Sequence, residues 1–146
     1  MRKLILAISV LALGSAAASA DPIADRQAIM KERGKIVGGL VKVVKGEQPF
    51  DAANVLDALK QLEANAEKFD VDTLFPAGSE QGGETTASPK IWEDMAGFKA
   101  AADKFLADTK AAVAAAPADV NALKSQVEAL GSDCGACHQT YRIKKG

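Results

Sequence analysis

Five consecutive residues near the C-terminus carry the chemistry that this sequence suggests. Cys134-Gly135-Ala136-Cys137-His138 has the pattern C-x-x-C-H, and the 146-residue chain contains no other Cys or His. Two thiols at this spacing can form thioethers with two vinyl groups on one edge of a porphyrin. The neutral imidazole that follows is a good axial ligand for iron. The pattern therefore predicts one covalent haem c per chain, attached through Cys134 and Cys137, with His138 as an iron ligand.

Other uses of these residues fit the pattern less well. A thioredoxin-like C-x-x-C lies where a strand meets the start of a helix, whereas this one falls near the end of a predicted helix. A structural disulfide leaves the adjacent His unexplained, and a metal site of two Cys and one His lacks a fourth strong ligand. These uses and a haem-free helical interaction protein are the alternatives to haem attachment.

Four helices are predicted to position the motif. Apolar residues recur every three to four positions in four segments, and no segment shows the alternation of a strand. In the last segment Leu130, Cys134, Cys137 and Tyr141 share one face, so the motif is expected to face inward. Short connections follow the first and third segments, which predicts an all-α, antiparallel up-down four-helix bundle enclosing the haem. The expected helices cover residues 22–45, 51–69, 89–116 and 119–141, with a long loop over 70–87.

The first twenty residues resemble an export signal. Arg2 and Lys3 precede an apolar run over 4–13 that is too short to span a bilayer comfortably, and Ala18-Ser19-Ala20 offers a cleavage site. We expect a cleaved signal peptide over 1–20, a periplasmic location, and a mature domain over 21–146 without a membrane anchor. An uncleaved anchor is the alternative.

Composition excludes several classes of function. Apolar residues make up 48% and charged residues 25% of the chain, which is typical of a globular domain. The net charge is −1, which argues against a basic nucleic-acid binder. The single His leaves no second imidazole for acid–base work, and no nucleophile–base pair is evident, so we expect a protein that is not an enzyme.

At this point the sequence resembles the class II cytochromes c, which include cytochrome c-prime. The C-x-x-C-H motif lies close to the C-terminus and is followed by Tyr141-Arg142, as in the family. The remaining similarity covers the mature chain and consists of RQAIMK at 26–31, KGE at 45–47 with PFD at 49–51, GGET at 82–85 and PKIW at 89–92.

The resemblance implies roles for residues outside the motif. Arg26 and Gln27 would lie near the haem propionates, and Glu84 and Thr85 would contact the haem edge. Helical spacing, rather than the resemblance, gives Arg142 a role: it lies four residues after His138, next to its ring, where it could bond a propionate or shield the imidazole. Its alternative role is to complement the dipole at the helix C-terminus.

The resemblance also places Met30 on the distal side of the iron, where two types of family member differ. In one type this methionine binds the iron, and the haem is low-spin and suited to electron transfer with redox partner proteins. In the other type the iron is five-coordinate and accepts nitric oxide or carbon monoxide. A plain core methionine is the alternative interpretation of Met30. Family members often form dimers through the first two helices, where Gly38 and Gly39 could permit a contact.

Overall fold

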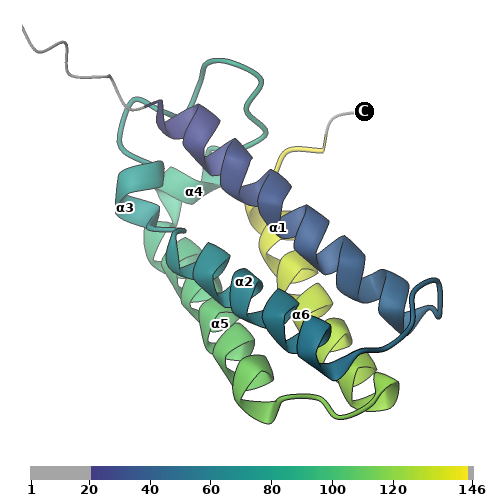
Figure 1. Cartoon of the computed structure of the whole chain (residues 1–146). Coiled ribbons are helices and arrows are strands. Elements are labelled where there is room, and N and C mark those ends of the chain that lie inside the picture. Colours follow the sequence, from purple (N-terminus) through teal and green to yellow (C-terminus); the bar gives the residue numbers. More distant parts are fainter. Residues whose placement is uncertain (1–20, 145–146) are drawn as a thin grey trace, which may run out of the picture.

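The computed structural model describes residues 21–144, which form a bundle of four long helices (Figure 1). Helix α1 packs against α2 and α6, α2 packs against α5, and α5 packs against α6, which closes a ring of four. The long helices are α1 (Pro22–Val44), α2 (Ala52–Glu67), α5 (Met95–Ala115) and α6 (Val120–Tyr141). Within residues 21–144 there is no strand beyond an isolated bridge between Ala87 and Arg142. The predicted all-α four-helix bundle is confirmed.

Aspartate side chains cap the N-termini of α1, α2 and α6. The side chain of Asp21 accepts hydrogen bonds from the backbone N–H groups of Ile23 and Ala24, and Pro22 follows as the first helical residue. Asp51 caps α2 and Asp119 caps α6 in the same way. Each cap satisfies backbone donors that the first turn of a helix leaves without partners.

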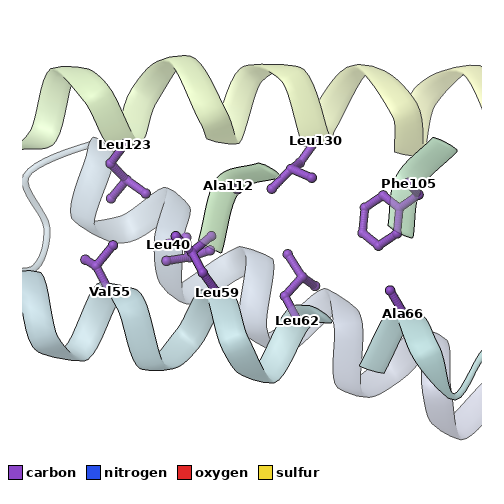
Figure 2. Packing of buried hydrophobic residues seen from close by; sticks show 9 residues of the cluster. All are labelled: Leu40, Val55, Leu59, Leu62, Ala66, Phe105, Ala112, Leu123 and Leu130. Carbon is purple, nitrogen blue, oxygen red and sulfur yellow. The ribbon is translucent and has the colours of Figure 1, made fainter. Parts of the chain in front are cut away.

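A leucine-rich core fills the half of the bundle where α1 connects to α2 and α5 connects to α6. Leu59, Leu62 and Leu123 are fully buried, and they come from two different helices of the ring. Figure 2 shows how side chains from all four long helices meet on the bundle axis. Burying such a side chain contributes about 1.5–3 kcal/mol, so the apolar stripes fix how the helices face each other. The set is Leu40, Val55, Leu59, Leu62, Ala66, Phe105, Ala112, Leu123 and Leu130.

A second, aromatic cluster occupies the other end of the bundle. Phe75, Phe98 and Tyr141 pack edge to face, with ring centroids 4.7 Å apart for Phe75 and Phe98 and 5.1 Å apart for Phe98 and Tyr141. The short helices α3 (Val71–Leu74) and α4 (Lys90–Glu93) contribute Val71, Leu74 and Ile91 to it.

Two parts of the chain differ from the sequence-based expectation. The predicted loop over 70–87 contains helix α3, which Asp70 caps through the N–H of Thr73. The predicted third helix is interrupted at Asp94, whose non-helical backbone (φ −134°, ψ 57°) separates α4 from α5. Asp94 instead caps α5 at Gly97 N–H and accepts a 2.9 Å hydrogen bond from the Tyr141 hydroxyl. A tertiary contact thus sets a helix boundary that local periodicity does not reveal.

The expected signal peptide lies outside the described residues. Its cleavage and the periplasmic location therefore stay predictions. No helix within residues 21–144 is long and apolar enough to cross a membrane.

Candidate functional site

A cavity of about 520 Å³ lies between α1 and α6, next to the aromatic cluster. Its size falls within the range of cofactor sites, about 300–1,000 Å³. Aromatic and aliphatic side chains form much of its wall, namely Phe69, Phe75, Phe98, Ile91 and Val37. The three residues of the sequence motif, Cys134, Cys137 and His138, line the same cavity.

Helix α6 presents both thiols to this cavity near its C-terminal end. Cys134 and Cys137 are free and partly buried, and burial raises the pKa of both thiols while the nearby charge of Arg33 opposes that shift. A catalytic C-x-x-C thiol has a lowered pKa, usually at a helix start. The thiols of this chain have neither property, which disfavours the thioredoxin-like alternative.

The surroundings of His138 act on the charge of its imidazole. Partial burial lowers its pKa, and the positive charges of Arg142 and Arg33 lower it further. The neutral imidazole is therefore favoured, and a neutral ring nitrogen is the form that donates a lone pair to a metal.

Met30 approaches the cavity from the facing helix. It lines the cavity together with Gln27 and Gly34, which lie about one turn before and after it on α1. Met95, the other methionine of residues 21–144, packs against the aromatic cluster and is not part of this wall. The structure thus brings Met30 and His138 to one cavity, and ligation by Met30 stays a prediction.

Arg26 lines the cavity but also ties down the loop beyond it. The residue is 4% exposed, and its guanidinium donates to the carbonyl of Leu74 (3.1 Å), to the hydroxyl and carbonyl oxygens of Ser79 (3.1 and 2.8 Å) and to the hydroxyl of Thr85 (3.0 Å). The guanidinium carbon of Arg26 lies 4.8 Å from the centre of the Phe75 ring. These bonds anchor the loop, and the contact of Arg26 with haem propionates stays a prediction.

The other predicted residues fall into two groups. Gln27, Thr85 and Arg142 line the cavity, and Arg142 Nε lies 3.4 Å from the hydroxyl of Thr86. Glu84 is exposed and is not part of the cavity wall within the described residues.

Loss of the forked Arg26 guanidinium is expected to loosen the segment 74–85. Arg26→Lys keeps the charge, but a single ammonium cannot reach all four oxygens. Each lost hydrogen bond costs roughly 1 kcal/mol, and relaxation of the loop recovers part of that cost. We therefore expect the free energy of unfolding to fall by about 1–2 kcal/mol. Hydrogen exchange at the amide of Ser79, which donates to the Pro76 carbonyl, should become faster. Unchanged exchange there would contradict the anchoring role.

Sequence reasoning missed Arg33, which lines the cavity one turn after Met30. One signal could have identified Arg33: it is a charged residue that shares a helix face with the apolar residues Met30 and Val37. Its contacts come from α2 and α5, so the sequence could not identify them.

The residues present fit a covalently attached haem. Two unbridged thiols lie on one helix face, a neutral imidazole follows them, and all three line an apolar cavity of cofactor size. Within residues 21–144 no cluster of three or more His, Cys, Asp or Glu side chains could hold a bare metal ion. An organic macrocycle that supplies the other iron ligands matches this donor set.

Known proteins agree with this interpretation. The Cytochrome C' family model matches residues 21–142. A cytochrome c-556 from Agrobacterium fabrum is 42% identical over 127 residues, which cover 87% of this chain and 84% of that protein. A cytochrome c' from Rhodopseudomonas palustris is 38% identical over 144 residues, covering 97% of this chain and 94% of that protein.

Solved structures show the same fold. The cytochrome c' structure from Rhodopseudomonas palustris aligns with a TM-score of 0.81 at 37% identity, over 88% of this chain and 100% of that one. A nitric oxide complex of a cytochrome c prime variant from Alcaligenes xylosoxidans aligns with a TM-score of 0.74 at 32% identity, over 85% and 94% of the two chains. The chain therefore belongs to the cytochrome c' family of class II cytochromes c, haem proteins of the electron-carrier class that bind haem c covalently.

Proposed function

We propose that this protein is a periplasmic, non-catalytic monohaem electron carrier whose haem is attached through Cys134 and Cys137, with His138 as the proximal ligand. The observation that carries the proposal is that α6 places both thiols and the imidazole on the wall of one apolar cavity. When bound, a haem supplies reversible one-electron chemistry at iron. The chain's own residues hold the group in place, keep the imidazole neutral and exclude water with an aromatic wall.

Met30 is proposed as the sixth ligand. Its thioether comes from α1, and the imidazole of His138 comes from α6 on the facing side of the same cavity. A shell of Met and His raises the reduction potential and changes little on reduction, which suits electron transfer. The partners would be redox proteins that dock transiently and carry complementary charge.

Replacing Met30 tests this assignment directly. We expect Met30→Leu, which keeps the volume but removes the sulfur, to convert a low-spin ferric spectrum into a high-spin one and to abolish the methionine-to-iron charge-transfer band. Met95→Leu is the matched control because Met95 packs outside the cavity wall, and it should leave the spectrum unchanged. A high-spin spectrum in the unmutated protein would refute ligation by Met30.

Binding of nitric oxide or carbon monoxide to a five-coordinate iron is the second candidate. It is favoured by the apolar wall around Met30, where an added Cβ at Gly34 would have nothing within 4 Å, and by the nitric oxide complex among the similar structures. Ready carbon monoxide binding by the unmutated ferrous protein would support this role over electron transfer.

A homodimer through α1 and α2 is also proposed. Added Cβ atoms at Gly38 and Gly39 would meet nothing within 4 Å, so this part of α1 offers a surface of small residues. Sedimentation equilibrium of the unmutated protein distinguishes monomer from dimer.

A further inference from the structure

A second, smaller cavity of about 40 Å³ lies beside the motif in the bundle interior. Arg33 from α1 and Asp133 from α6 both line it, together with Cys134 and the ring of Phe105. Two side chains of opposite charge thus reach one small internal space next to a proposed attachment residue.

Arg33 is held in place but is not fully hydrogen-bonded. Its Nε donates to Oδ1 of the buried Asn65 at 2.9 Å, and its guanidinium carbon lies 4.4 Å from the centre of the Phe105 ring. Its Nη2 is buried and has no hydrogen-bond partner in the part of the chain that the structure describes. An arginine carries its charge at any ordinary pH, so this nitrogen is an unsatisfied donor on a cation.

Asp133 has a buried acceptor oxygen that is not hydrogen-bonded. Its side chain is 8% exposed, and Oδ1 lies 2.5 Å from the ammonium of Lys104, which also pairs with Asp108. Oδ2 is buried and accepts no hydrogen bond from residues 21–144, and burial, together with the neighbouring Asp108 carboxyl, raises the pKa of Asp133, which the ammonium of Lys104 opposes. A buried acceptor of this kind costs free energy unless something donates to it.

We propose that Arg33 and Asp133, the charge pair that lines the smaller cavity from α1 and α6, shift the reduction potential of a haem attached at Cys134 and Cys137 in opposite directions. This inference rests on the haem attachment that the proposed function requires.

The electrostatic consequence follows from where Arg33 lies. Arg33 also lines the larger cavity, and its charge acts on both thiols and on the imidazole of His138. A fixed positive charge in a low-dielectric interior favours the state with one more electron, and a fixed negative charge opposes it. Loss of Arg33 and loss of Asp133 should therefore move the potential in opposite directions.

Spectroelectrochemical titration of the holoprotein tests the inference. We expect Arg33→Met to lower the potential and Asp133→Asn to raise it, each by a shift on the order of tenfold in the ferrous-to-ferric ratio, or about 59 mV for one electron. Arg33→Lys keeps the charge and should retain most of the potential, which separates charge from packing. Lys110→Met removes a charge from an exposed ion pair with Glu67 and should have little effect.

The outcomes separate this inference from the proposed function. Intact mass reports haem attachment, and the visible spectrum reports the iron ligands. Attached haem with normal spectra but shifts of the same sign, or no shifts, would overturn the role of the charge pair while leaving the proposed function in place.

Discussion

Replacement of Cys134 and Cys137 together by serine is expected to abolish covalent haem attachment. A serine hydroxyl does not form the thioether that a thiol forms with a vinyl group, and the described residues contain no other cysteine. The variant should be produced in a host competent for cytochrome c assembly. Its intact mass should equal that of the polypeptide alone, and acid–acetone should extract all of its haem.

Two controls make this result specific. Ser132→Ala alters an exposed residue just before the motif on the same helix and should leave attachment complete. Each single variant, Cys134→Ser or Cys137→Ser, keeps one thiol and should retain haem through one thioether in part of the molecules. A haem adduct on the double variant would show that attachment uses another residue and would remove the basis of the proposed function.

The placement of the C-x-x-C-H residues on one cavity wall could be predicted from the sequence because it is local. The C-x-x-C-H residues lie within five positions of one helix, so the helical repeat alone places Cys134 and Cys137 on the face that also carries Leu130 and Tyr141. The N-caps at Asp21, Asp51 and Asp119 were predictable for the same reason, since each cap bonds a backbone N–H two or three residues ahead.

The contacts that shape the cavity could not be predicted, because they join distant parts of the chain. Arg26 bonds residues 48 to 59 positions away, and Tyr141 bonds Asp94 across 47 positions. Local propensity contains no information about such pairs. The side chain of Arg33 shows the same limit, since its partner Asn65 lies 32 positions away on α2.

A close approach at Gly97 underlies the second large effect that we expect. Gly97 lies in the first turn of α5, where its N–H donates to the capping carboxylate of Asp94 at 3.1 Å. A Cβ added at this position would lie 2.5 Å from Oδ2 of Asp94 and 2.6 Å from the hydroxyl of Tyr141. The hydrogen bond from Tyr141, followed by that from Gly97, also lowers the pKa of Asp94, so the carboxylate is tied to this arrangement.

Gly97→Ala is therefore expected to destabilise the protein although alanine is the better helix former. The added methyl would force Asp94 and Tyr141 apart and disturb the cap of α5, and we expect a loss of about 2–4 kcal/mol from overpacking and the weakened cap together. Urea unfolding of the holoprotein measures this loss.

Gly131→Ala is the matched control for this prediction. Gly131 is an exposed position of α6 where an added Cβ would have nothing within 4 Å, so helix propensity alone should stabilise the protein by up to about 1 kcal/mol. The two substitutions are chemically identical, and opposite signs would trace the difference to the contact of Gly97 with Asp94 and Tyr141. If Gly97→Ala were as stable as Gly131→Ala, that contact would not hold the end of α6 against the start of α5. Other contacts would then have to hold Tyr141 in its place in the cavity wall.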